Sequence, residues 1–110
     1  MQLNVKGKNL EVSDSIRSYA ERKMGKLSRQ LSDLAQVEVE LAVEKNPRIA
    51  ESQVAEATVW VKGHTLHAHE ASVDMKTSID GLTQKLLRQV KAERDKKTLE
   101  RRRHAADLKE

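Results

Sequence analysis

The clearest strand signal in the sequence is VEVELAV, residues 37–43, in which Val37, Val39 and Leu41 alternate with acidic or small side chains. Alternation with a period of two is typical of a strand that buries one face and exposes the other. The stretch KNPR at residues 45–48 ends the strand, because proline lacks a ladder donor and restricts the residue before it. Residues 37–43 are therefore predicted to form a strand with one apolar face and one acidic face.

Three more strands are predicted around this one. Residues 55–62 alternate, and the turn formed by residues 62–64 leads into a strand over about 65–72 with Leu66 and Ala68 facing inward. Residues 2–7 alternate more weakly and end at Gly7. Trp60 is expected on the sheet face opposite the inward residues, half-covered by neighbours such as Thr58 and the C-terminal tail; a small partner-binding patch is the alternative.

Two segments repeat apolar residues at spacings of three and four, the pattern of one helix face. The first follows N-cap chemistry at residues 12–15 and contains Ile16, Ala20, Met24, Leu27, Leu31 and Leu34. The second starts near Asp74 and contains Met75, Ile79, Leu82, Leu86 and Val90. We predict helices over about 14–31 and from about 74 to 97. Gly25 is not expected to interrupt the first helix, because it costs a helix only about 1 kcal/mol relative to Ala.

These elements predict an α/β (α+β) fold with the order β-α-β-β-β-α. A four-stranded sheet with two helices on one face would bury every apolar stripe at once, as a two-layer sandwich. The length of 110 residues suits one domain. We predict that domain over residues 1–97 and a charged, flexible C-terminal tail over 98–110.

The net charge of +4 hides an uneven distribution. Residues 1–31 carry seven Lys/Arg and three Asp/Glu, residues 32–84 carry four and nine, and residues 85–110 carry ten and five. Helical periodicity directs the helix cations away from the core, while Glu38, Glu40 and Glu56 would make the opposite sheet face negative. A basic face with few aromatic residues predicts recognition of RNA phosphates and shape rather than bases.

Several classes of protein are excluded by composition. Without Cys there is no disulfide, thiolate metal site or cysteine nucleophile. No apolar run could span a bilayer or serve as a signal peptide, so a cytoplasmic protein is expected.

Candidate chemical sites are weak. His67 and His69 would share a strand face, but Glu70 points to the other face, so no metal site is expected. Glu38 and Glu40 lie on a solvated strand face, which does not suit acid–base catalysis. We therefore expect no enzyme activity, cofactor or small-molecule substrate.

Short motifs follow one another in a characteristic order along the chain. They are MQLNV at 1–5, LEVS at 10–13, KMGKL at 23–27, VEVEL at 37–41, AEATV at 55–59, LHA at 66–68, DM at 74–75, IDGL at 79–82 and KLLRQ at 85–89. Over residues 1–97 this ordered set resembles the ribosome hibernation promoting factors, the family also called sigma-54 modulation proteins.

The resemblance implies a fold related to double-stranded-RNA-binding domains and a role without catalysis. It implies binding to the small ribosomal subunit in the channel of mRNA and of A- and P-site tRNA, with contacts to 16S rRNA and neighbouring ribosomal proteins. Such binding would block translation in stationary phase or stress. The family's basic positions match Arg17, Lys23, Lys26, Lys85 and Arg88. Periodicity adds Arg22, Arg29, Lys91, Arg94 and Lys96 as candidate rRNA-binding residues.

One departure from the family affects a candidate site. Lys76 stands where the family usually has Tyr, so the packing or stacking of that ring would be lost, although a cation at a helix start could still meet phosphate. The family resemblance favours a factor that promotes inactive ribosome dimers and is monomeric when free. Alternatives are an inhibitor that blocks tRNA and mRNA without promoting dimers, a general double-stranded-RNA-binding module, or an interaction domain that uses the sheet face.

Overall fold

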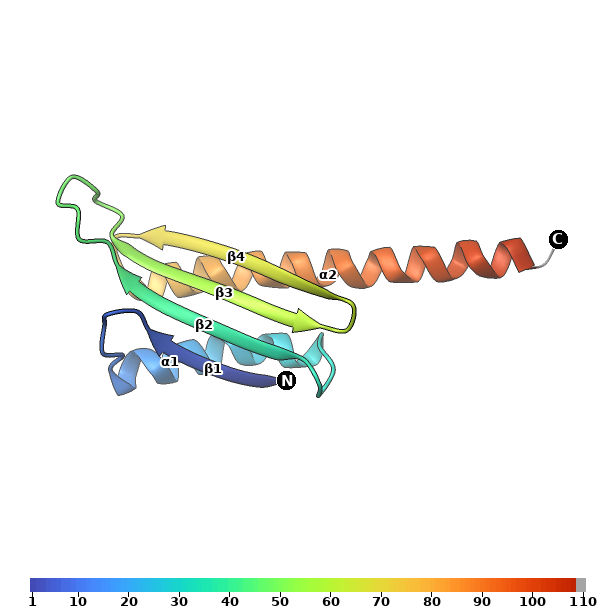
Figure 1. Cartoon of the computed structure of the whole chain (residues 1–110), viewed down its shortest axis with the longest axis horizontal. Helices are drawn as coiled ribbons and strands as arrows, with labels where there is room; N and C mark the ends of the chain where they lie inside the picture. The colour runs from blue at the N-terminus through green and yellow to red at the C-terminus, as the bar shows by residue number, and fades with distance from the viewer. Residues whose placement is uncertain (109–110) are drawn as a thin grey trace.

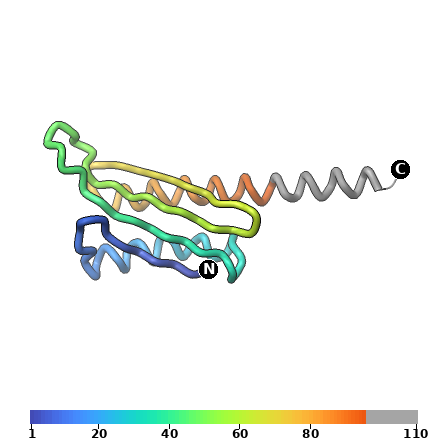
Figure 2. Tube along the Cα trace, viewed as in Figure 1, coloured from blue at the N-terminus to red at the C-terminus, as the bar shows by residue number. Residues whose placement is uncertain are grey.

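A computed structural model of the chain describes the backbone of residues 1–108 and the side chains of residues 1–95. The path of the chain is drawn in Figures 1 and 2. Its elements are β1 (Gln2–Gly7), α1 (Asp14–Met24), the short 3-10 helix η1 (Gly25–Arg29), β2 (Gln36–Val43), β3 (Gln53–Val61), β4 (His64–Ser72) and α2 (Met75–Leu108). The predicted β-α-β-β-β-α order is confirmed.

The four strands form one sheet in the order β1-β2-β3-β4. β1 and β2 are parallel, whereas β2 with β3 and β3 with β4 are antiparallel. A parallel pair needs a crossover connection, and α1 with η1 supplies it. Both helices lie on the same side of the sheet (Figure 1). The predicted two-layer sandwich is thereby confirmed.

The core follows the alternation of the strands. Val37, Val39 and Leu41 are at most 2% exposed, while the glutamates between them face away from the helices. The strand register places Val39 between Val5 of β1 and Ala57 of β3, both of which are also buried. The helices close this aliphatic core with Ala20, Met24, Leu27, Ile79, Leu82, Leu86 and Val90.

The predicted helix starts and hairpin turn are confirmed by their local geometry. The backbone N–H of Ile16 donates to Ser13 Oγ at 3.2 Å, which caps α1. The backbone N–H of Thr77 donates to Asp74 Oδ2 at 3.1 Å in the same way. Gly63 turns β3 into β4 with a φ of 89°, a left-handed conformation that glycine adopts without strain.

The first helix differs from its prediction over 14–31. The α-helix ends at Met24, and residues from Gly25 onward form η1, in which Ser28 Oγ donates to the carbonyl of Gly25 at 2.6 Å. Leu27 is fully buried on η1, but Leu34 is 91% exposed in the loop that follows. The α-helix therefore ends just before Gly25, a residue of low helix propensity. The tighter 3-10 turns that follow still bury Leu27.

The second helix is longer than predicted. Its backbone is helical to Leu108 rather than fading after about residue 97. The side chains of the predicted tail, including Arg101, Arg102 and Arg103, lie outside the described residues. The division into a domain over 1–97 and a flexible tail stays a prediction. Within the described part of the chain, no helix combines the length and apolar character needed to cross a membrane.

Candidate nucleic-acid interface

Several cations of the helix layer have no acidic partner among the described side chains. Besides Lys76 at the start of α2, five of them are exposed and form no ion pair within residues 1–95: Arg22, Lys26, Arg29, Arg88 and Lys91. Helical periodicity places Arg88 and Lys91 on the side of α2 away from buried Leu86 and Val90. Because both helices cover one face of the sheet, the five side chains lie on the outer surface of one layer. We call them the basic surface.

Three residues of the basic surface come together at η1. Arg22, Lys26 and Arg29 line one shallow hollow of about 530 Å³ with Gly25 and Gln30. Side chains three residues apart eclipse one another in a 3-10 helix, so η1 directs Lys26 and Arg29 to the same side. Close like charges without an internal partner are stabilised by a polyanion, and the phosphate backbone of a nucleic acid is one. We call this depression the basic hollow.

Gln30 connects the two helices at the edge of the basic hollow. Arg94 Nη1 donates a hydrogen bond to Gln30 Oε1, which ties α2 to the end of η1. The contact brings Arg94, a predicted site residue, next to the hollow. Sequence reasoning missed Gln30 because a single glutamine carries no pattern and its partner lies 64 residues away.

A second group of cations surrounds the ring of Tyr19. Arg22 Cζ and Lys76 Nζ each lie 5.3 Å from the ring centroid, and Lys23 Nζ lies 5.5 Å from it. These distances are in the range of cation–π contacts. Tyr19 therefore places an aromatic ring of α1 beside Lys76 on α2. Lys23 also pairs with Asp80 at 3.5 Å, so it is partly neutralised.

Tyr19 offers a direct optical test of this cluster. Its phenol donates to Asp80 Oδ1 at 2.5 Å, and this hydrogen bond raises the pKa of Tyr19 above its ordinary value of 10.0, assisted by desolvation and the Asp80 charge. Tyr19 is the only tyrosine in the chain, so tyrosinate absorbance reports it alone. Asp80→Asn is expected to lower the titration midpoint because it weakens the hydrogen bond and removes the charge of Asp80. The exposed-carboxylate control Asp33→Asn should leave the midpoint unchanged.

The same pKa shift fixes a pH dependence of stability. A phenol whose pKa is raised by folding stabilises the native state fully below pH 10, and this contribution is lost as the pH rises through the raised pKa of Tyr19. Wild type should therefore lose more stability than Asp80→Asn above pH 10 in urea titrations. Equal midpoints and equal alkaline losses in the two proteins would contradict the assigned hydrogen bond.

Two predicted site residues are already engaged at the edges of the sheet. Arg17 Nη1 donates to the carbonyl of Val5 on edge strand β1. Lys85 Nζ donates to the carbonyl of His69 on the other edge strand, β4, at 2.6 Å and pairs with Glu70 at 3.3 Å. Such side chains cover edge carbonyls that could otherwise pair with another strand. Arg17 and Lys85 are thus hydrogen-bonded to backbone carbonyls, whereas the residues of the basic surface form no ion pair within residues 1–95.

The last predicted cation, Lys96, has a side chain outside the described residues. Its contribution to an RNA contact stays a prediction.

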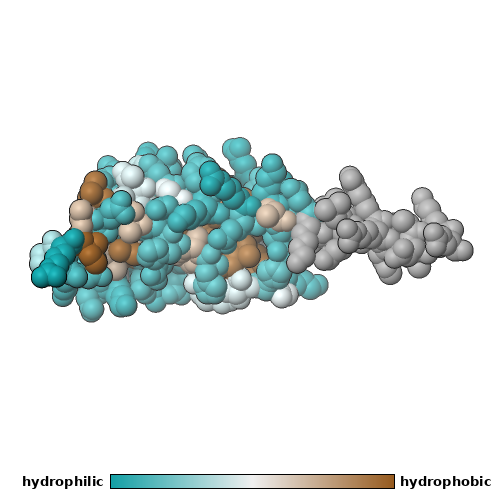
Figure 3. Space-filling model, turned by 90° about the horizontal axis from the view of Figure 1, so that it is seen from above, coloured by the Kyte–Doolittle hydropathy of each residue, from teal (hydrophilic) through white to brown (hydrophobic). Residues whose placement is uncertain are grey.

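Seen from above, the described surface is mostly hydrophilic, with smaller apolar patches (Figure 3).

The outer face of the sheet is less acidic than the sequence predicted. Lys6 on β1 pairs with Glu38 at 2.6 Å and with Glu40 at 3.6 Å. The hydrogen bond to Glu38 raises the pKa of Lys6 above 10.5. Glu56 lies 4.0 Å from His69. These contacts partly neutralise the negative charge of the outer sheet face. The alternation within one strand did not predict them, because the partners lie on neighbouring strands. The charge asymmetry of the molecule therefore comes mainly from the helix layer.

The histidines of β4 are explained by local contacts. His67 Nδ1 lies 3.3 Å from Thr58 Oγ1. Glu70 lies on the opposite face of β4, toward the helices, where it pairs with Lys85. Among the described residues, no group of three or more His, Asp or Glu side chains could hold a metal ion.

Comparison with known proteins agrees with this architecture. The sequence profile of the Sigma 54 modulation protein / S30EA ribosomal protein family matches residues 3–98. The ribosome hibernation promoting factor of Salmonella typhimurium is 38% identical over 96 residues, which cover 87% of this chain and 96% of that protein. The Thermus thermophilus Protein Y N-terminal domain has a TM-score of 0.69 at 30% identity, covering 84% of this chain and 98% of that one.

A ribosomal subunit interface protein from Coxiella burnetii has the same fold, with a TM-score of 0.73 at 21% identity over 86% of this chain and 99% of that one. The profile match and the Salmonella relative together extend over nearly all of residues 1–98. The chain therefore belongs to the Sigma 54 modulation protein / S30EA ribosomal protein family.

Proposed function

We propose that this protein is a ribosome hibernation factor that binds the small ribosomal subunit through the basic surface. The observation that carries the proposal is the basic hollow, where three cations converge without an acidic partner among the described residues. The name of the Salmonella relative, ribosome hibernation promoting factor, supports the same role. The partner is 16S rRNA with its neighbouring ribosomal proteins, and the place of action is the cytoplasm.

The bound position we propose is the mRNA and tRNA channel around the A and P sites. The support is the family resemblance together with the surface chemistry. Exposed Arg and Lys side chains on two packed helices suit phosphates at fixed spacing, whereas base-edge readout requires groove-entering motifs that the chain lacks. A protein seated in that channel would exclude tRNA and mRNA and would block translation without catalysis.

We propose in addition that the bound protein promotes inactive ribosome dimers. The alternative within the same family is an inhibitor that blocks the channel without promoting dimers. The alternative outside it is a general double-stranded-RNA-binding module. The three differ in what they bind and in the particle that results, so a sedimentation experiment separates them.

The test is co-sedimentation of the purified protein with small subunits, large subunits and an RNA duplex, followed by gradient profiles of stationary cells with and without the gene. We expect salt-sensitive binding to small subunits, weaker binding to the duplex, and a dimer peak that depends on the protein. Absence of low-salt binding to small subunits would refute the proposal. Equal affinity for the duplex would favour the general RNA-binding module, and binding without a dimer peak would favour the simple inhibitor.

A further inference from the structure

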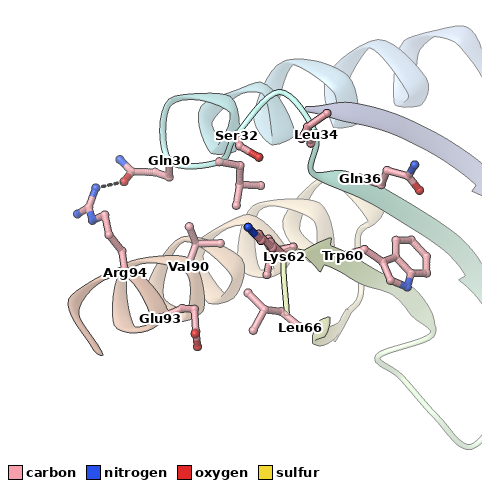
Figure 4. Close-up of a pocket in the computed structure, with 12 residues that line it drawn as sticks. Gln30, Ser32, Leu34, Gln36, Trp60, Lys62, Leu66, Val90, Glu93 and Arg94 are labelled. Carbon is pink, nitrogen blue, oxygen red and sulfur yellow. Dashed lines mark hydrogen bonds between the residues drawn. The ribbon is translucent and has the colours of Figure 1, made fainter. Parts of the chain in front are cut away.

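A groove of the described part of the molecule lies at one end of the sandwich. It has a volume of about 800 Å³ and is formed where the loop between η1 and β2, the turn between β3 and β4, and α2 meet (Figure 4). Clefts of this size hold small organic groups. No pattern in the sequence predicts the groove, because its walls come from three separate segments.

The groove has an apolar lining with one aromatic side chain. Leu31, Leu66 and Val90 belong to it, and Leu34 stands on its rim with 91% of its surface exposed. Trp60 lies at one end beside Gln36, its register partner on β2 (Figure 4), and follows buried Val59 on β3, so it lies on the predicted sheet face, opposite the helices. Trp60 is 41% exposed, so much of its surface remains accessible to a ligand.

The polar groups around the groove favour a ligand that carries negative charge as well as an apolar group. Lys62 is exposed and forms no ion pair within residues 1–95. The one acidic lining residue, Glu93, has its Oε2 atom 2.8 Å from His64 Nε2, and the lining also contains the two cations Lys62 and Arg94. At the end away from Trp60, Gln30 and Arg94 are joined by their hydrogen bond (Figure 4). The remaining charge on the rim is therefore positive.

The groove is adjacent to the basic hollow, because Gln30 lines both depressions. An RNA strand whose phosphates lie against Lys26 and Arg29 would meet the groove next. Base stacking on an aromatic side chain tolerates any base, since every base has a π-face. A paired base inside a helix is already stacked, so the ligand must be unpaired.

We propose that this groove accepts an unpaired nucleobase of the RNA bound at the basic hollow, and that Trp60 stacks on that base. The inference rests on the proposed RNA-binding function and extends it. It assigns to the protein one contact with a single-stranded nucleotide in addition to phosphate contacts. The positive rim favours RNA over an apolar peptide, which would leave Lys62 without a counter-charge.

The first test uses Trp60 as its own probe, because it is the only tryptophan in the chain. Single-stranded hexauridylate should quench and shift its emission at low salt. Inorganic polyphosphate, which supplies phosphates without bases, should bind the basic hollow and leave the emission unchanged. Unchanged emission with hexauridylate, or equal changes with both ligands, would overturn the proposal.

The second test compares variants by sedimentation with small subunits. Trp60→Leu keeps an apolar side chain but cannot stack, and it should lower affinity about 10-fold. Trp60→Phe should recover most of that loss, because a smaller ring still stacks. Val73→Ser is the matched control, since Val73 is 71% exposed and lies outside the groove. Equal affinity of Trp60→Leu and wild type would overturn the proposal.

The outcomes separate this inference from the proposed function. The stacking contact alone is refuted if wild type sediments with small subunits, hexauridylate leaves its Trp60 emission unchanged, and Trp60→Leu binds small subunits as tightly as wild type. Quenching by hexauridylate without any binding to subunits would support the groove and refute the hibernation role. Weaker subunit binding by Trp60→Leu without quenching by hexauridylate would point to a ribosomal protein in the groove and would overturn the RNA assignment.

Discussion

Reversing the charges of Lys26 and Arg88 together is expected to lower the affinity for the small ribosomal subunit by about 100-fold or more. Both side chains are exposed and unpaired within residues 1–95, one on η1 and one on α2. A hydrogen bond to a charged group contributes about 1.5–3 kcal/mol, so two lost phosphate contacts amount to about 3–6 kcal/mol. The glutamates would add repulsion. Co-sedimentation at several salt concentrations measures the loss.

The salt dependence gives an independent reading of the same variant. Each lost phosphate contact should reduce the slope of log affinity against log salt by about one. Lys45→Glu with Arg48→Glu is the matched control, because it changes the net charge equally in the loop between β2 and β3. An equal loss in the control would mean that net charge, not the basic surface, governs binding. An unchanged affinity in Lys26→Glu with Arg88→Glu would refute the assigned face.

The fold could be predicted from sequence because its signals are local. Alternation in residues 37–43 and the apolar stripes of the two helices determine which face is buried, and four strands with two helices leave few ways to bury all of these faces. The same periodicity correctly directed Lys26 and Arg88 toward solvent. These conclusions need only the spacing of residues along the chain.

The remaining features depend on contacts between distant segments. Arg17 and Lys85 look like other helix cations in sequence, yet they bind carbonyls of the two edge strands. Leu34 continues the spacing of the first helix but falls in a loop, because the chain changes to η1 at Gly25. The ring of Tyr19 reaches Lys76 across the helix pair. No pattern within one segment predicts such pairings.

The basic hollow shows how such a local change affects the candidate site. If the α-helix had continued to residue 31, Lys26 and Arg29 would lie about 60° apart around the helix axis, on the same face as Arg22. In η1 they do eclipse, so they lie together in one depression with Arg22. The departure from the predicted helix therefore changes the relative directions of these cations but keeps them together at the place where we propose that RNA binds.

Replacing Gly7 by Ala is expected to destabilise the fold by about 3 kcal/mol. A Cβ atom at Gly7 would lie 1.9 Å from the carbonyl oxygen of Leu10 and 3.1 Å from Val12 Cγ2. The clash is with backbone, so the connection from β1 to α1 must move, and both Leu10 and Val12 pack against the core. Overpacking and backbone strain each cost about 1–3 kcal/mol. Urea unfolding followed by Trp60 fluorescence measures the change.

Gly25 provides the matched control for this variant, because the same substitution there meets an open site. No atom lies within 4 Å of a Cβ built at Gly25, and its φ of −56° suits any residue. Gly25→Ala should stabilise the protein by up to about 1 kcal/mol, since alanine favours helix and restricts the unfolded chain. Opposite signs for the two variants are the expected result. If Gly7→Ala lowers the free energy of unfolding by less than about 1 kcal/mol, the β1–α1 connection can move at little cost. The close approach of Leu10 to Gly7 would then not constrain the fold.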